Sequence, residues 1–198
     1  DYVVSLVKNN HEVAILSRGY GRLTKGYFEA KNTSTFKEIG DEPLMLYCKH
    51  PEVRVAVAER RQLGMENLLK KAKPNTVFVW DDCFQHRWVS PDLMILLTSF
   101  EHLFVNDYHL PVGSLRELSS GKKRADVVIV TKCPTKLTKQ NKAQITQKLQ
   151  LAKTQQLFFA KIGYANQIRN QEHTFPIDKI ENVPFVLITG IADPKPLL

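Results

Sequence analysis

Short apolar runs, separated by polar loops, recur along the sequence. The run at residues 76–80, Thr-Val-Phe-Val-Trp, is rich in β-branched and aromatic side chains and shows no alternation. Such a run predicts a strand that is covered on both faces and central in a parallel sheet. Further strands are predicted over residues 11–16, 27–30, 53–58, 93–97, 126–131, 156–160 and 185–189.

Helices are predicted between several of these strands. Helical periodicity is present in residues 1–8 and 137–152, and a third helix is predicted to reach about Lys71. Pro43 suits the first turn of a fourth helix, whereas residues 31–37 have no periodicity and predict an exposed loop. Strands that alternate with helices in this way predict an α/β fold with a doubly wound, mostly parallel sheet.

Residues 131–138 are the best candidate for a hinge between two lobes. We therefore expect a core over residues 1–131 and part of a second, smaller lobe over residues 132–198. The chain begins inside a helical pattern and ends abruptly after residues 188–194. It is therefore expected to be a fragment of a longer protein.

Composition narrows the class of protein. The 198 residues, 43% of them hydrophobic, suffice for one sizeable globular core, which excludes disordered and fibrous classes. The net charge of +8 predicts an anionic partner such as nucleic acid, nucleotide phosphates or an acidic membrane surface. Three widely spaced cysteines indicate a reducing, cytosolic setting. No apolar run approaches the roughly 18 residues of a transmembrane helix.

A polar cluster follows the run at residues 76–80 directly. Asp81 and Asp82 come first, and Gln85 and His86 follow them. Ligands of open α/β sheets bind at the carboxyl ends of the strands, and two adjacent carboxylates there favour a magnesium-linked phosphate site. An acidic turn with one helix cap is the alternative.

Two further segments carry candidate groups for anion binding. Residues 17–22, Ser-Arg-Gly-Tyr-Gly-Arg, combine glycines, which let backbone N–H groups approach a ligand, with the guanidinium groups of Arg18 and Arg22. A turn flanked by solvated arginines fits the same residues equally well. Arg60 and Arg61 lie where a helix begins after a strand, so they can face either phosphate or solvent.

Two more loops contain charged residues whose roles the pattern leaves open. Asp41, in the segment Gly-Asp-Glu-Pro, either caps a helix or stands as a free carboxylate near a reacting hydroxyl. Residues 110–117 suggest a substrate-side loop that closes on the charged pair Arg116 and Glu117. The basic run that follows, Gly-Lys-Lys-Arg, is not a phosphate-binding loop because Arg116 occupies the position of the required first glycine.

Taken in order, these motifs resemble those of the tetraacyldisaccharide 4′-kinase family, the lipid A kinases of Gram-negative bacteria. The resemblance rests on residues 17–22, residues 40–43, Asp81-Asp82 with Gln85-His86, Leu110-Pro111 with residues 115–117, and residues 189–194. It implies a P-loop NTPase-like core that uses ATP and Mg²⁺. The implied reaction, a step of lipid A biosynthesis, transfers the γ-phosphoryl group to the 4′-hydroxyl of a tetraacylated glucosamine disaccharide 1-phosphate. Peripheral contact with the cytoplasmic face of the inner membrane is also implied.

The resemblance gives each acidic candidate a role. Asp41 resembles the catalytic carboxylate that orients or deprotonates the sugar hydroxyl, and Glu42 contacts the metal ion or a metal-bound water. Asp81 and Asp82 are similar to the Walker B acids, one of which holds magnesium against the β- and γ-phosphates.

The remaining candidates are expected to bind phosphate or substrate. Gln85 and His86 resemble residues that position the nucleotide or the substrate phosphate. Contacts to substrate are expected from Arg18, Arg22, Arg60, Arg61, Arg116 and Glu117. Of all these residues, Asp41, Asp82 and His86 are expected to be catalytic.

The sequence departs from the family pattern at three points. Cys83 stands where the family commonly has glycine, and both the glycine-rich ATP loop expected before residue 1 and a His-containing segment expected after Leu198 are absent. Residues 1–198 alone are therefore expected to bind ATP poorly and to be inactive.

Two other functions remain open at this point. One is a basic, non-catalytic module that binds nucleic acid or an anionic membrane surface, and the other is a P-loop relative that phosphorylates another hydroxyl compound. A nucleic-acid partner is not expected, since the chain lacks a recognised motif and interleaved aromatic side chains.

Overall fold

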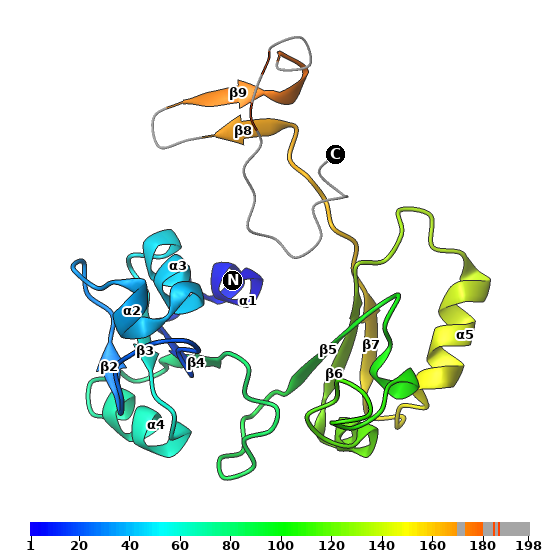
Figure 1. Ribbon diagram of the computed structural model, residues 1–198, viewed down its shortest axis with the longest axis horizontal. Coiled ribbons are helices and arrows are strands. Elements are labelled where there is room, and N and C mark those ends of the chain that lie inside the picture. The colour runs from blue at the N-terminus through cyan, green and yellow to red at the C-terminus, as the bar shows by residue number, and fades with distance from the viewer. Residues whose placement is uncertain (170–172, 180–183, 185, 187–198) are drawn as a thin grey trace.

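The computed structural model describes residues 1–169, 173–179, 184 and 186. In Figure 1 one sheet with its helices lies at the left and a second sheet lies at the right, joined by the segment between β4 and β5. The left-hand sheet contains β1 (Val13–Ser17), β2 (Phe28–Glu29), β3 (Arg54–Val57) and β4 (Val77–Trp80) in the order β2-β3-β1-β4. β1 is parallel to both β3 and β4, whereas β2 is antiparallel to β3.

Helices cover both faces of this first sheet. They are α1 (Tyr2–Val7), α2 (Phe36–Ile39), α3 (Asp41–Lys49) and α4 (Arg61–Leu69). Val13 and Ile15 of β1 lie in a core with residues of α1 and α3, whereas Ala14 and Leu16 lie in a core with α4. Because successive strand residues point to opposite faces, β1 fills both cores and is buried along its whole length.

The second sheet contains β5 (Ile95–Ser99), β6 (Val127–Thr131) and β7 (Gln156–Phe159), all parallel. α5 (Lys139–Leu149) packs against it through Ile145 and Leu149, which share a core with Val128 and Val130. The side chain of Thr138 caps α5 by accepting a hydrogen bond from a backbone N–H. Short 3₁₀ helices lie in the connections: η1 (Phe104–Asn106) and η2 (Ser119–Arg124).

β4 corrects the prediction for residues 76–80. The apolar run predicted a central strand covered on both faces, but each residue of β4 is only half-buried. Within the described part of the chain β4 pairs only with β1, so it lies at the edge of its sheet. Its apolar side chains lack the neighbours that an interior strand would have, and β1 is the buried strand instead.

Two other segments contain elements that the sequence did not predict, and a third lies outside the described residues. The last two residues of the loop expected over residues 31–37 belong to α2 (Phe36–Ile39), which begins with a capping box between Thr35 and Glu38. The polar segment after β7 contains an antiparallel hairpin, β8 (Gln167–Arg169) and β9 (Thr174–Pro176), followed by η3 (Ile177–Lys179). The strand expected over residues 185–189 and the motif at residues 189–194 lie outside the described residues.

The expected boundary between residues 131 and 132 stays a prediction. β6 ends at that point and β7 follows α5, yet β6 and β7 are neighbours in one sheet. Residues on both sides of the boundary belong to the same hydrophobic cluster. Among the described helices, none has the length and apolar character needed to cross a membrane.

Candidate functional site

The carboxyl ends of β1 and β4 lie side by side at one edge of the first sheet. Leu16 is in register with Trp80, so Ser17 and Asp81 come next on the two strands. Ser17 Oγ donates a hydrogen bond to Asp81 Oδ2 at 3.3 Å, and the N–H of Gly19 donates to Ser17 Oγ at 3.4 Å. The loop at residues 17–22 is thereby anchored to Asp81, the first residue of the acidic pair, at the edge of the sheet where ligands of open α/β sheets bind.

Two glycines let that loop pack closely against the start of α3. Gly19 and Gly40 have φ values of +69° and +92°, which are in the region that favours glycine. A Cβ atom at Gly40 would lie 3.1 Å from the carbonyl oxygen of Tyr20. This close approach places Asp41 and Glu42, the first residues of α3, beside the loop at residues 17–22, which we call the arginine loop.

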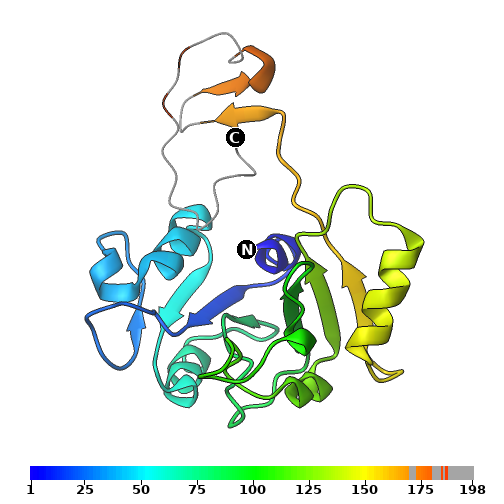
Figure 2. The ribbon, with the colours of Figure 1, turned by 45° about the vertical axis from the view of Figure 1, so that its right-hand side comes forward.

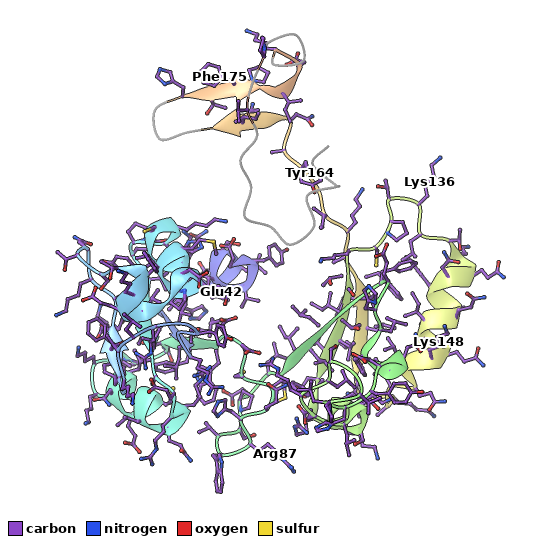
Figure 3. All side chains as sticks on the ribbon, in the orientation of Figure 1. Glu42, Arg87, Lys136, Lys148, Tyr164 and Phe175 are labelled. Atoms are coloured by element: carbon purple, nitrogen blue, oxygen red, sulfur yellow. The ribbon has the colours of Figure 1, made fainter. Side chains whose placement is uncertain are left out.

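Glu42 lies within electrostatic range of the other predicted acids. Burial is the main reason why its pKa is raised, and the charges of Asp81, Asp41 and Asp82 raise it further. The Asp41 carboxylate accepts a hydrogen bond from the N–H of Glu42 at 3.0 Å, and it does not cap α3. Figure 3 labels Glu42 on the side of the first sheet that is nearer the second sheet.

Asp82 forms a bidentate ion pair with Arg116. Arg116 Nη1 donates to Asp82 Oδ2 at 2.8 Å, and Nη2 donates to Oδ1. These hydrogen bonds hold the pKa of Asp82 below its ordinary value, and the charges of Arg61 and Arg18 act in the same direction. Asp82 also has a φ of +44°, a left-handed conformation that aspartate tolerates better than most residues. The carboxylate is therefore ionised and tied to the loop at residues 110–117.

Arg61 lies behind the acidic pair and is only 2% exposed. Its Nη1 donates to the carbonyl oxygen of Ala58 at 2.6 Å, and its Nη2 donates to that of Asp81 at 3.2 Å. Burial lowers the pKa of this guanidinium, whereas the charges of Cys83, Asp82 and Asp81 raise it. Since arginine remains protonated in proteins, Arg61 places a fixed positive charge beneath the carboxylates.

His86 closes the turn that follows Asp82. Its backbone N–H donates to the carbonyl oxygen of Cys83 at 2.8 Å. Burial is the main cause that lowers the pKa of His86, with a further contribution from the charges of Arg61 and Arg18. The imidazole is consequently neutral at pH 7, when one of its nitrogens can accept a proton.

Burial also raises the pKa of the Cys83 thiol. The thiol is therefore protonated near neutral pH and is a poor nucleophile.

Two of the predicted substrate-binding residues form ion pairs with residues that the sequence did not predict for the site. Arg22 has a buried side chain that donates to the carbonyl oxygen of Gly26 and to Glu59 Oε1, both at 2.6 Å. Glu117 accepts hydrogen bonds from Arg124 Nη2 at 2.9 and 2.7 Å rather than pairing with its sequence neighbour. Arg116 and Glu117, the charged pair of residues 110–117, therefore belong to two separate ion pairs, because each contacts a different segment.

Three predicted residues keep their polar groups exposed at the same edge of the first sheet. Arg18, Arg60 and Gln85 are exposed, and in the described part of the chain their side chains make no hydrogen bond or ion pair. Arg60 is also the N-cap residue of α4. These groups are available to an anionic ligand.

Arg124 is a residue that the sequence pattern does not single out. Its guanidinium lies 4.6 Å from the centroid of the Phe84 ring, and its Nη2 donates to the Phe84 carbonyl oxygen at 3.1 Å. Phe84 in turn packs against the core of the second sheet. Arg124 therefore joins the loop after β4 to that sheet. The basic run at residues 121–124 is the sequence signal that could have indicated it.

The acidic residues suit magnesium that arrives with a nucleotide. The described residues contain no group of three or more His, Cys, Asp or Glu side chains arranged to hold a metal ion. Magnesium at nucleotide sites needs only one or two carboxylates, because phosphate oxygens and waters complete its coordination. Asp81 and Asp82 supply such oxygens at the end of β4.

Comparisons with known proteins match the chain to one family. The family model described as LpxK, tetraacyldisaccharide-1-P 4′-kinase, matches residues 2–198. The chain is 42% identical over 209 residues to the tetraacyldisaccharide 4′-kinase of Bacteroides thetaiotaomicron. It is 40% identical over 196 residues to the protein of the same name from Flavobacterium johnsoniae.

A solved structure gives the same result for the fold. The crystal structure of LpxK from Aquifex aeolicus in complex with ATP matches with a TM-score of 0.69 at 29% identity, over 91% of this chain and 54% of that one. The P-loop NTPase-like α/β fold expected from the sequence is thereby confirmed. The two curated relatives are covered over 55% and 58% of their length, so this chain spans a little over half of each.

Proposed function

This chain belongs to the tetraacyldisaccharide-1-P 4′-kinase family, and from this premise we propose that it supplies the acidic part of a lipid kinase site. In the proposed reaction, the γ-phosphoryl group of ATP passes to the 4′-hydroxyl of a tetraacylated glucosamine disaccharide 1-phosphate, a step of lipid A biosynthesis. The observation that carries the proposal is that Glu42, next to Asp41 at the start of α3, lies within electrostatic range of Asp81 and Asp82, which follow β4.

The acidic residues have different roles in the proposed reaction. Asp81 and Asp82 hold Mg²⁺ with the nucleotide, and the bound ion supplies charge neutralisation at the β- and γ-phosphates. Asp41 orients the sugar hydroxyl and accepts its proton. Glu42, whose pKa is raised mainly by burial and then by its acidic neighbours, is placed to contact the ion or its water.

The basic residues bind and orient the phosphates. Arg18 and Arg60 are exposed beside the acidic cluster and can offer bidentate hydrogen bonds to phosphate. Arg61 balances the charge of the carboxylates from beneath, and neutral His86 with Gln85 positions the nucleotide or substrate phosphate. Arg116 holds Asp82 in place. Arg22, which is bound to Glu59, maintains the shape of the arginine loop.

The acylated substrate implies a membrane location. We place the protein at the cytoplasmic face of the bacterial inner membrane, in peripheral contact, with the lipid and ATP as its partners. No residue among 1–198 forms the G-x-x-x-x-G-K-[ST] motif that cradles phosphates, so the proposal concerns the acidic and substrate-binding side of the site.

Substitution of Asp41 tests the proposal. In the full-length protein, Asp41→Asn should lower kcat about 100-fold or more, because general-base catalysis typically contributes a factor of that size. The assay follows transfer of labelled phosphate from ATP to the tetraacyl disaccharide 1-phosphate dispersed in detergent. Asp92→Asn, at an exposed residue outside the site, is the matched control and should keep full turnover.

Circular dichroism of both variants separates lost chemistry from lost folding. Unchanged turnover of a folded Asp41→Asn protein would remove Asp41 from the mechanism. If the unsubstituted full-length protein shows no transfer at all, the proposed reaction itself is wrong.

A further inference from the structure

The positive charge of this chain is concentrated in one segment. Residues 127–169 contain seven lysines and one arginine but no aspartate or glutamate. Eight of the 28 basic residues and none of the 20 acidic residues therefore lie here. The segment alone accounts for the net charge of +8, and the rest of the chain is neutral overall.

The seven lysines are exposed: Lys132, Lys136, Lys139, Lys142, Lys148, Lys153 and Lys161. The ion pairs found within the described residues all lie between residues 1 and 124. Lys142 lies 5.6 Å from the centroid of the Phe159 ring, a contact that leaves its charge uncompensated. In Figure 3, Lys136 and Lys148 extend away from the second sheet near the two ends of α5.

Four of the lysines lie just after β6, just before or at the start of α5, and just after β7, and we call them the lysine edge: Lys132, Lys136, Lys139 and Lys161. Lys132 follows β6 directly, and Lys161 comes two residues after β7. The N–H of Cys133 donates to the carbonyl oxygen of Ala160 at 2.9 Å, which holds the two connections together. The lysine edge is therefore built by the fold from separate segments.

The apolar side of α5 is not available for insertion into a membrane. Ile145 and Leu149 are 7% and 0% exposed and belong to the core of the second sheet. Gln140, Gln144 and Gln147 are exposed on the helix. A partner of this surface would therefore be held by charge, without burial of an apolar helix face.

We propose that the lysine edge and α5 contact an anionic phospholipid surface. Lysine is a flexible point charge that suits a diffuse layer of headgroups, whereas arginine suits bidentate recognition of single phosphates. Arg18 and Arg60 are exposed at the candidate site, whereas every basic residue from 127 to 161, on the second sheet, is a lysine. The choice of a bilayer over nucleic acid rests on the proposed function, in which the substrate is acylated.

Vesicle sedimentation with the full chain tests this surface. The protein should bind phosphatidylcholine vesicles that contain phosphatidylglycerol, should not bind pure phosphatidylcholine, and should dissociate as salt is raised. Each lysine near an anionic surface strengthens binding about fivefold. Lys→Gln substitution of all four residues of the lysine edge should therefore weaken the partition coefficient about 100-fold or more.

A matched control removes the same charge elsewhere. Lys25, Lys31, Lys37 and Lys70 are also exposed and have no ion pair in the part of the chain that the structure describes. Their fourfold Lys→Gln variant should bind anionic vesicles much more strongly than the lysine-edge variant. Equal losses in the two variants, or unchanged binding of the lysine-edge variant, would overturn the proposal.

Two further measurements distinguish lipid binding from nucleic-acid binding and from catalysis. The affinity for labelled duplex DNA, measured by fluorescence anisotropy, should be the same for the lysine-edge variant and for the control variant. If the lysine-edge variant loses DNA binding but keeps vesicle binding, the surface binds nucleic acid instead. Phosphorylation of detergent-dispersed substrate should be unchanged in the lysine-edge variant. If the unsubstituted full-length protein has no kinase activity, the proposed function fails, while the vesicle comparison still decides this inference.

Discussion

The guanidinium of Arg116 is the main reason why the pKa of Asp82 is low, because it donates two hydrogen bonds to that carboxylate. The two residues are 34 positions apart in sequence, so the loop at residues 110–117 controls the charge at the end of β4. The native pKa lies below the unfolded value of about 3.9. The pair therefore stabilises the fold fully above that value, and this contribution is lost as the pH falls through the native pKa.

Arg116→Gln should raise the pKa of Asp82 toward its ordinary value. At pH 7 the variant should be less stable by about 1 kcal/mol or less, because the side chains of Arg116 and Asp82 are 54% and 49% exposed. The difference should vanish in acid below the native pKa of Asp82. An NMR titration of the Asp82 carboxyl carbon, together with urea unfolding at several pH values, measures both effects.

Arg87→Gln is the control for this experiment, since Arg87 is exposed and makes no ion pair among the described residues. Figure 3 labels Arg87 on the segment that joins the two sheets. If both variants leave the Asp82 titration unchanged, the ion pair does not set its pKa in solution.

At the scale of elements, the arrangement of the arginine loop against α3 depends on Gly40. This residue has φ +92° and ψ +158°, a conformation essentially restricted to glycine. A Cβ atom there would also lie 3.2 Å from Gly19 Cα. The start of α3, and with it Asp41, is therefore positioned by two backbone segments that approach too closely for a side chain.

Gly40→Ala should destabilise the fold by about 3 kcal/mol, the upper part of the range for a residue held in such a conformation. Gly21→Ala should cost less, about 1–2 kcal/mol, because Gly21 has φ +75° but a Cβ atom there would meet nothing within 4 Å. Gly163→Ala, where neither problem arises, should be neutral. Urea unfolding of the three variants gives this ranking, and equal stabilities would refute the close-packing argument.

At the scale of the whole molecule, the two sheets have separate hydrophobic cores. The cluster around β6 and α5 shares no residue with the two clusters around β1. Figure 2, which is turned by 45° from Figure 1, shows α5 on the outer side of the second sheet. The connections identified at residue level are the Asp82–Arg116 pair and the contacts of Arg124 with Phe84.

Leu149→Ala should therefore affect mainly the second sheet. Leu149 is fully buried. Truncation of such a residue typically lowers the free energy of unfolding of the surrounding core by roughly 2–5 kcal/mol. Native-state hydrogen exchange should show lost protection in β6 and α5 with little change in β1. Leu16→Ala, at a buried residue of β1, should give the reverse. Uniform loss of protection in either variant would mean that the cores unfold as one unit.

Sequence patterns located most of the elements and part of the site. Strands β1, β3 and β6 and helix α5 were predictable because apolar periodicity is a local property of the chain. The hairpin of β8 and β9 was not, because its residues carry too weak a periodic signal. The contacts of Arg124 with Phe84 and Glu117 were missed because they join three separate segments.

The sequence by itself determined the alternation of strands and helices, the acidic pair at the end of a strand, and the net charge. Each of these depends on residue type and on neighbours along the chain. Only the tertiary structure decided that β4 lies at the edge of its sheet, that Arg116 binds Asp82, that Arg22 pairs with Glu59, and that the connections after β6 and β7 are held together. Strand order and charge pairing depend on distances between segments remote in sequence, and folding sets those distances by burying apolar surface rather than by the local pattern of charges.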